Sequence, residues 1–418
     1  MNSKILSVLP GVLLCGRTTE IELKVNDLPD GEYLLRIFPV SYPSGKYAEP
    51  KPVNIVDGKA MINIEPDREQ EYRLVLYKDR DWLADCFVYA VKEDLYELNP
   101  YKGDFHMHSN QSDGKEPPAE VAAQGRAIGF DIMAVTDHGL YNPSLEAIAA
   151  YEGVKLDIKL CPGEEVHPPK NPVHIINFGG RASVNALFDT QEYKQGVTEI
   201  QANLPPLKDG CDPYEYASSL WVFNKIRELG GMSIFCHPYW RFPYYEAAQD
   251  YYISEGLTSQ MFEDRPFDAY EVLGGYSLAE QDSNTLQTAR YSEERQRGPL
   301  PIVGVSDAHG CCNELFGWYF TIVFSKECTL EGIKEGICAL RSIAVEKLPG
   351  REARAYGPFR LVQFALFLLR EYFPTHDALC AQEGQLMKDW INSDKTAGDK
   401  LAGLSGQTDA WIKKFYGR

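Results

Sequence analysis

The first hundred residues alternate polar and apolar side chains in short runs. Four runs follow the two-residue period of a β-strand: Glu20–Val25, Tyr33–Ile37, Ala60–Ile64 and Tyr72–Tyr77. Turn sequences such as Pro29-Asp30-Gly31 and Asp57-Gly58 separate them. Short strands at this spacing predict a small N-terminal β-sandwich over residues 1–99. This region contains no histidine, so we expect a packing or oligomerisation role, and a homo-oligomer stays open.

From about residue 100 the pattern changes to apolar strands that alternate with helices. Pro117–Ile128 and Leu220–Leu229 have helical apolar faces, and each is followed by glycine. We predict seven strands: Lys102–His108, Asp131–Thr136, Lys159–Val166, Val173–Phe178, Met232–Cys236, Ala269–Gly274 and Ile302–Ser306. Strands and helices in alternation predict an α/β fold with a mainly parallel sheet, most simply a barrel at residues 100–348.

Two segments, 180–218 and 238–266, interrupt this alternation and are rich in Tyr, Pro and Asp. Long loops of this kind commonly shape a substrate site. Four aromatic residues in the second segment either stack on a base or sugar or pack the fold: Tyr239, Trp240, Tyr244 and Tyr245. The last stretch, 349–418, predicts a helical extension in which Trp390, Trp411 and Phe415 pack against the barrel.

Composition and charge limit the classes of partner and the cellular location that we expect. A chain of 418 residues with 44% hydrophobic residues is long enough for two or three domains. A net charge of −18 argues against general binding to nucleic acid or to an anionic membrane. Ten scattered cysteines without a C-x-x-C pair favour reduced thiols and a cytoplasmic location. Pro10 interrupts the apolar run Ile5–Leu14, so we expect no export leader.

The histidines lie where predicted strands end. His106 and His108 alternate with Phe105 and Met107, which sends both imidazoles to one face, and Asp113 follows on a loop. Taken alone, this alternation is also compatible with a half-exposed strand in which histidines happen to alternate with apolar residues. The other groups at or near strand ends are Asp137-His138, Glu164-Glu165 with His167, His174, Cys236-His237 and Asp307-Ala308-His309. Strand ends of a barrel converge on one mouth, so this placement predicts a metal site.

Several of these residues have local alternatives. Strand alternation sends only one of Glu164 and Glu165 into the mouth and does not say which. His167 competes with His174, and we prefer His174 because His167 falls in a loop before two prolines. Asp137 either orients an imidazole or makes an ordinary structural hydrogen bond. Cys236 is predicted to face the packing on the opposite side of its strand.

The ordered motifs resemble those of the PHP (polymerase and histidinol phosphatase) metallohydrolases. They are Gly103-Asp-Phe-His-Met-His-Ser, Ser112-Asp113-Gly114, Ala134-Val-Thr-Asp-His138, Gly163-x-Glu165, Cys236-His237-Pro238 and Val305-Ser-Asp-Ala-His309. The segment that begins at Glu271 is similar to the CehA/McbA-type branch. The resemblance covers roughly residues 100–346 and implies a distorted (β/α)7 barrel, similar to a TIM barrel, with two or three divalent metal ions, usually Mn, Fe or Zn.

The resemblance also implies a ligand set. His106, His108, Glu165 and Asp307 would hold one metal ion, and Glu165 would bridge to a second held by His174 and His237. A third group would complete the cluster: Asp113, His138 and His309. Other members have His where this chain has Asp113, and the carboxylate favours a harder ion such as Mn²⁺.

The predicted activity is hydrolysis of a small phosphorylated substrate by metal-activated water. His237, Asp307 and His309 are the candidate catalytic residues, with His309 or His237 protonating the leaving group. Lys115, Arg181 and Arg241 are candidate phosphate contacts, each with the alternative of a solvated surface charge. Two rival interpretations stay open: a carbamate or amide hydrolase on the same site, and a binding protein with a degenerate barrel.

Overall fold

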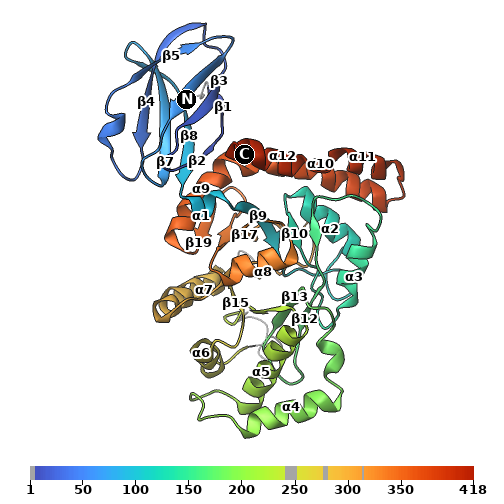
Figure 1. Ribbon diagram of the computed structural model, residues 1–418. Helices are drawn as coiled ribbons and strands as arrows, with labels where there is room; N and C mark the ends of the chain where they lie inside the picture. The colour runs from blue at the N-terminus through green and yellow to red at the C-terminus, as the bar shows by residue number, and fades with distance from the viewer. Residues whose placement is uncertain (1–4, 241–251, 276–280, 313–314) are drawn as a thin grey trace. The chain divides into compact units, whose positions relative to one another are not determined.

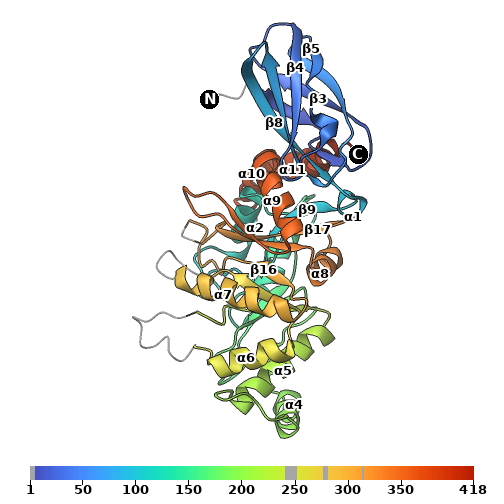
Figure 2. The same ribbon diagram turned by 90° about the vertical axis from the view of Figure 1, so that its left-hand side faces the viewer.

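The computed structural model describes residues 5–240, 252–275, 281–312 and 315–418 (Figures 1 and 2). Its contacts divide the chain into two compact units. Unit 1 comprises Met1–Asn99, Phe359–Leu379 and Gly406–Arg418, and unit 2 comprises Pro100–Pro358 and Cys380–Ser405. The predicted helical extension therefore contributes to both units, and the predicted domain limits stay a prediction.

The described strands of unit 1 form two sheets (Figure 1). One has the order β1-β3-β6 and the other the order β2-β8-β7-β4-β5. Their bounds are β1 Ile5–Leu9, β2 Val12–Leu14, β3 Thr19–Val25, β4 Gly31–Pro39, β5 Lys51–Ile55, β6 Lys59–Ile64, β7 Gln70–Lys78 and β8 Asp81–Val91. Alternate residues of β3 are buried, namely Ile21, Leu23 and Val25. Side chains from both sheets share one hydrophobic core, which explains the alternation in the sequence.

Three helices of unit 1 are α1 (Glu93–Tyr96), α9 (Phe359–Glu371) and α12 (Gln407–Tyr416). The carbonyl oxygen of Phe415 accepts a 2.8 Å hydrogen bond from the Gly11 amide, and a Cβ at Gly11 would lie 2.5 Å from the Phe415 ring. Trp411 Nε1 donates to the Tyr372 carbonyl at 3.2 Å. The prediction that Trp411 and Phe415 pack against the barrel is therefore wrong, because α12 packs its apolar side on β1 and β2.

Unit 2 contains a six-stranded and a five-stranded sheet among its described residues. The first has the order β11-β10-β9-β17-β18-β19, and the second the order β12-β13-β14-β15-β16. Their bounds are β9 Asn99–Asp104, β10 Ile132–Met133, β11 Lys159–Leu160, β12 Gly163–Val166, β13 Ile175–Phe178, β14 Met232–Phe235, β15 Ala269–Leu273, β16 Ile302–Gly304, β17 Tyr319–Ser325, β18 Ser342–Glu346 and β19 Arg354–Tyr356. Two isolated parallel bridges join them, Met107 to Ala308 and His138 to Glu165. Unit 2 is thus a mixed α/β unit with a curled sheet.

Strand direction differs from the prediction at one place. β13 pairs antiparallel with both β12 and β14, so Val166 lies opposite Ile175 and Phe178 opposite Met232. The connection between β12 and β13 is short, and a parallel crossover needs a dozen or more residues. β17 is a further difference, because the sequence did not predict this strand, whose seven residues are all buried.

Helices flank the sheets of unit 2 (Figure 2). Their bounds are α2 Pro118–Ala127, α3 Asn142–Ala149, α4 Gln191–Ala202, α5 Pro213–Glu228, α6 Glu255–Asp264, α7 Gln281–Glu294, α8 Leu330–Cys338 and α11 Thr396–Leu404. The helix α10 (Phe373–Ile391) begins in the residues of unit 1 and continues in those of unit 2. Asp212 caps α5, accepting from the amides of Tyr214 and Glu215, with Pro213 at the first position. α6 and α7 run side by side, joined by a 3.0 Å ion pair between Arg290 and Glu255. Of the helices described, none is both long and apolar enough to span a bilayer.

Candidate metal centre

Two histidines follow β9 and point to the same side of the sheet. β9 ends one residue before Phe105, and the chain continues through the bridge between Met107 and Ala308. Phe105 and Met107 are fully buried, while the rings of His106 and His108 lie together with centroids 5.3 Å apart. The alternation of the sequence therefore delivers two imidazoles to one place, as predicted.

Glu165 lies at the middle of the imidazoles. Its carboxylate is fully buried, and six ring nitrogens surround it. Oε1 lies 2.8 Å from His174 Nδ1 and 3.4 Å from both His106 Nε2 and His237 Nε2. Oε2 lies 2.5 Å from His138 Nδ1, 3.3 Å from His167 Nε2 and 3.6 Å from His108 Nε2.

The adjacent Glu164 points away from these rings. Its carboxylate accepts hydrogen bonds from Asn177 Nδ2 at 3.0 Å and from the Val184 amide at 2.6 Å. Only one of the two adjacent carboxylates therefore reaches the centre, as the alternation predicts, and it is Glu165, the residue that the motif resemblance implied.

Asp307 supplies a second carboxylate from the segment after β16. Its Oδ1 lies 2.8 Å from His108 Nε2 and 3.1 Å from His106 Nε2, and its Oδ2 lies 3.9 Å from His237 Nε2. The residue has a left-handed backbone with φ of 51°, and its amide donates to the His106 carbonyl at 2.8 Å. A left-handed conformation at a non-glycine residue is costly, and here it turns the carboxylate toward the imidazoles.

A third group lies at the more exposed side of the centre. Asp113 Oδ1 is 3.4 Å from His138 Nε2 and 3.3 Å from His309 Nε2. The His108 ring stacks with both His138 and His309, with centroid distances of 4.1 and 4.3 Å. The four residues of this group, His108, Asp113, His138 and His309, each offer a ligand atom within 4.8 Å of the others.

These donor sets fit divalent cations. His106 Nδ1 lies 3.1 Å from Glu271 Oε2, so the ring proton belongs on Nδ1 and the lone pair of Nε2 faces Glu165 and Asp307. Within the described structure, both oxygens of Glu165 and Nε2 of His106 are buried without a hydrogen-bond partner. Lone pairs that face carboxylate oxygens need positive charge between them, and imidazole with carboxylate suits Zn, Fe or Mn.

Charge coupling keeps the carboxylates ionised. Burial alone raises the pKa of Glu165 and Asp307, but the neighbouring imidazoles, led by His138 and His106 respectively, hold each pKa well below its usual range. Burial lowers the pKa of His138, and Glu165 and Asp113 outweigh that effect and raise it to about 11. Protons on imidazoles thus supply positive charge that a bound cation would otherwise bring.

Two residues next to His106 were not predicted to act at the centre. Glu271 on β15 is fully buried and accepts the His106 Nδ1 proton, an arrangement that fixes the orientation of a metal-binding imidazole. Cys236 is the second of these residues. Its Sγ lies within 4.8 Å of a ligand atom of His106 and of one of Glu271, so the prediction that Cys236 faces the packing is wrong. β14 ends at Phe235, so the strand alternation no longer applies at Cys236.

Asp137 has a structural role. Its Oδ1 accepts from the Ser109 amide at 2.8 Å and from Ser112 Oγ at 2.5 Å, and its Oδ2 accepts from Ser109 Oγ at 2.7 Å. These bonds hold the loop that carries Asp113. Of the two alternatives for Asp137, the structure favours the structural hydrogen bond over the orientation of an imidazole.

The reversal of β13 places both His167 and His174 at the centre. His167 follows β12 and His174 precedes β13, so both lie at the same end of this antiparallel pair. Their rings stack with centroids 3.9 Å apart. The sequence left His167 and His174 as competing candidates, but in the structure both rings face Glu165.

The same reversal removes one predicted phosphate contact. Arg181 follows the other end of β13, and its Nη2 donates to the Glu228 carbonyl at the end of α5, at 2.8 Å. Lys115 is exposed on the loop after Asp113 and is not among the residues that line the cavity described next. Arg241 lies outside the described residues, as do Tyr244 and Tyr245.

A cavity of about 490 Å³ opens over the centre. Its described lining comprises Asp113, His138, His167, His174, His237, Trp240, Gly275, Asp307, His309 and Leu315. This lining contains no lysine or arginine among the described residues. Trp240 is its aromatic wall, whereas Tyr239 is buried. Segment 180–218, predicted to shape the substrate site, contributes no residue to this lining.

Comparisons with known proteins give limited matches, and no family model matches the chain. A segment of 54 residues, 13% of this chain, is 43% identical to the DNA polymerase/3'-5' exonuclease PolX of Bacillus subtilis (strain 168), and spans 10% of that protein.

Two solved structures are similar in part. One is a two-domain protein of Bacteroides vulgatus described as containing a predicted PHP-like metal-dependent phosphoesterase, with a TM-score of 0.44, 18% identity, and coverage of 66% of this chain and 71% of that one. The other is an amidohydrolase of Chromobacterium violaceum, with a TM-score of 0.32, 20% identity, and coverage of 51% and 89%. Likeness at this level does not assign an activity.

Proposed function

We propose that this chain is a metal-dependent hydrolase, and more specifically a phosphoesterase of the PHP type. The observation that carries the proposal is the fully buried carboxylate of Glu165 with six imidazole nitrogens around it. Isolated buried charges are strongly disfavoured, so such a cluster fits a site built for cations.

The proposed ligands are those that converge in space. His106, His108, Glu165 and Asp307 would hold one ion, Glu165 with His174 and His237 a second, and Asp113 with His138 and His309 a third. His167 adds a further nitrogen beside Glu165, 3.3 Å from Oε2. Two or three Mn, Fe or Zn ions would supply a water of lowered pKa and positive potential for the oxygens of the scissile group.

The chain's own residues supply the proton for the leaving group. His309 is the most exposed imidazole of the centre, at 36%, and its Nδ1 lies 2.8 Å from the Asp307 carbonyl. That contact places the ring proton on Nδ1 when the ring is neutral, so Nε2 is the atom that exchanges a proton with substrate. His237 is the alternative proton donor. Asp307 contacts both rings, His309 through its carbonyl oxygen and His237 through its carboxylate.

Two kinds of substrate bond are candidates for cleavage by this site. The resemblance of the ordered motifs favours a phosphate ester of a small molecule, and the negative charge of the chain argues against a nucleic-acid substrate. The absence of lysine and arginine from the described lining of the cavity favours an uncharged substrate, such as a carbamate or amide. The segment at Glu271 resembles the CehA/McbA branch, which includes a carbamate hydrolase, and this resemblance supports the same alternative.

The barrel of the PHP family is also part of the proposal. Seven strands, β9, β10 and β12 to β16, follow one another through the two isolated bridges. We propose that they form a distorted (β/α)7 barrel, with the two sheets of unit 1 as an N-terminal β-sandwich.

The first test is hydrolysis by protein that has been stripped of metal and then reloaded with Mn²⁺, Fe²⁺ or Zn²⁺. The substrates are 4-nitrophenyl phosphate, bis(4-nitrophenyl) phosphate and a 4-nitrophenyl carbamate, so that one chromophore reports all three reactions. Metal-restored release from a phosphate ester is the expected result. Release of 4-nitrophenol from the carbamate alone would contradict the phosphoesterase proposal and support a carbamate or amide hydrolase.

Metal content is the second test, and it does not depend on the substrate. Glu165→Gln removes the central charge and is expected to lose most of the bound metal, because Glu165 contacts all three ligand groups. Glu152→Gln changes an exposed carboxylate and serves as control. Wild-type metal content in folded Glu165→Gln protein would contradict the site, and so would a wild-type protein that holds no metal.

A further inference from the structure

A second cavity lies at the other end of β16 from Asp307. Its volume is about 370 Å³, within the range of roughly 300–1,000 Å³ that small-molecule sites occupy. Three segments meet there: the end of α7 with the turn after it, residues 298–302 leading into β16, and the start of β18. All of them belong to unit 2.

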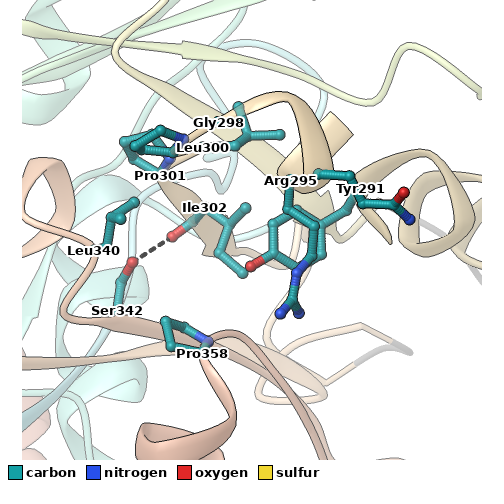
Figure 3. Close-up of a pocket in the computed structure, with 11 residues that line it drawn as sticks. Tyr291, Arg295, Gly298, Leu300, Pro301, Ile302, Leu340, Ser342 and Pro358 are labelled. Atoms are coloured by element: carbon teal, nitrogen blue, oxygen red, sulfur yellow. Dashed lines mark hydrogen bonds between the residues drawn. The ribbon is translucent and has the colours of Figure 1, made fainter. Parts of the chain in front are cut away.

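The walls of this cavity are mostly apolar. Leu300 and Ile302 are buried, and Pro299, Pro301, Leu340 and Pro358 complete the apolar lining. Ser342 does not offer a free hydroxyl, because its Oγ donates to the Ile302 carbonyl at 2.7 Å (Figure 3). A ligand therefore meets a hydrophobic surface on this side.

The polar side chains of Tyr291, Arg295 and Gln296 lie on the opposite wall. Figure 3 shows Tyr291 and Arg295 next to each other, facing Ile302, Ser342 and Pro358. The guanidinium carbon of Arg295 is 5.8 Å from the centre of the Tyr291 ring, so the cation rests near the aromatic surface. Tyr291 is 93% buried and belongs to the hydrophobic core, which fixes the position of its hydroxyl.

Apart from their contact with each other, neither Tyr291 nor Arg295 has a hydrogen-bond or ion-pair partner among the described residues. Neighbouring arginines do have partners: Arg290 is paired with Glu255 and Glu294, and Arg297 with Glu263 and Glu294. Arg295 makes no ion pair within the described residues, although the chain has a net charge of −18. An unpaired guanidinium beside a phenol donor fits a carboxylate, since a guanidinium binds that group through two parallel hydrogen bonds.

We propose that this second cavity is a binding site for a small aromatic carboxylate. The carboxylate contacts Arg295 and the hydroxyl of Tyr291, and the ring lies against Leu300, Ile302 and Pro358. The site is separate from the metal centre, because β16 runs between the cavity and Asp307. The proposal therefore does not depend on the activity of the metal centre.

Benzoate is the probe for the first test, with titration followed by calorimetry on full-length protein. Benzyl alcohol matches its size without the charge, and acetate matches its charge without the ring. We expect saturable benzoate binding and weaker binding of both comparison compounds. The titration is repeated with metal-loaded and metal-free protein, and equal affinity in both excludes binding at the metal centre.

Variants test the two polar contacts. Arg295→Gln is expected to weaken benzoate binding about tenfold, equivalent to about 1.4 kcal/mol, and Tyr291→Phe to weaken it less. Arg297→Gln removes the same charge two residues away, but Arg297 does not line the cavity, and it serves as the matched control. Arg295 is exposed, so its replacement leaves the fold intact. No saturable binding, equal affinity for benzyl alcohol, or equal effects of the two arginine variants would each overturn the proposal.

Discussion

The pair formed by Glu271 and His106 decides which nitrogen of His106 faces the centre. Glu271→Gln offers a donor as well as an acceptor and no longer fixes the proton on Nδ1. We expect the affinity for Mn²⁺ to fall about 10–100-fold, measured by titration of the metal-free protein. Glu293→Gln, exposed on α7, is the control. Unchanged affinity in Glu271→Gln, or no recovery in Glu271→Asp, would contradict an orienting role.

His138 makes the stability of the metal-free protein depend on pH. Its pKa is raised from 6.5 to about 11 in the fold, so its stabilising contribution is fully present below pH 6.5 and is lost as the pH rises through 11. Between pH 6.5 and 9.5, wild-type protein in chelator should lose about 3–4 kcal/mol more unfolding free energy than His138→Gln, at roughly 1.4 kcal/mol per pH unit. Urea denaturation at the two pH values measures this difference, and equal losses in the two proteins would refute it.

At the scale of single residues, local alternation carried most of the information. It predicted the shared face of His106 and His108, and that only one of Glu164 and Glu165 enters the centre. The choice of Glu165 came from the resemblance of the ordered motifs. It failed at Cys236, where the chain has already left β14 and His237 has a positive φ of 23°. Glu271 was visible only as part of a motif, because nothing in a buried strand indicates which polar residue meets an imidazole from another strand.

The loop that carries Asp113 is held by a close approach of two backbone segments. A Cβ at Gly114 would lie 2.5 Å from the His108 carbonyl oxygen and 2.8 Å from the Ser109 carbonyl carbon. Backbone atoms cannot turn aside, so Gly114→Ala should cost about 1–3 kcal/mol and shift Asp113. We expect weaker metal binding together with lower stability in urea.

Gly403→Ala is the control for this variant. A Cβ there meets nothing within 4 Å, and alanine favours the helix α11 by about 0.5–1 kcal/mol. Gly114→Ala protein with the metal affinity of the wild type would show that the loop can relax without moving Asp113.

At the scale of elements, the sequence predicted the strands better than their directions. The four N-terminal runs correspond to β3, β4, β6 and β7. The prediction of a mainly parallel sheet missed the reversal of β13, because a strand has the same side-chain period in either direction. β17 was not predicted, although other fully buried strands such as β13 and β14 were.

Within unit 2, residues after position 379 complete the packing of the earlier elements. Arg126 on α2 is 1% exposed, and its Nε donates to Glu383 Oε2 at 2.7 Å. Glu383→Ala leaves part of this buried charge unpaired, although Asp131 still contacts Nη1 at 3.1 Å. We expect a loss of about 3 kcal/mol in unfolding free energy, measured in urea. Gln382 is exposed at the preceding position, and Gln382→Ala should change stability by less than about 0.5 kcal/mol.

At the scale of the whole molecule, contacts between distant residues limited the prediction. Composition and periodicity indicated an N-terminal β region, an α/β region and C-terminal helices. They did not show that the C-terminal segment is divided between the two units. Arg126 and Glu383 are 257 positions apart, and Trp390 donates to the Ala150 carbonyl at 3.0 Å. Such pairings leave no periodic signal in the sequence.

The reversal of β13 has an evolutionary consequence. The chain leaves β13 at the end remote from the imidazoles, and it returns through α4 and α5 before β14 leads back toward them. Insertions and deletions in the loop between α4 and α5, residues 203–211, can therefore accumulate without displacing a ligand. Selection for the chemistry and selection for the outer surface act on separate stretches of sequence. Related chains that preserve the centre are expected to diverge most in the length and composition of this excursion.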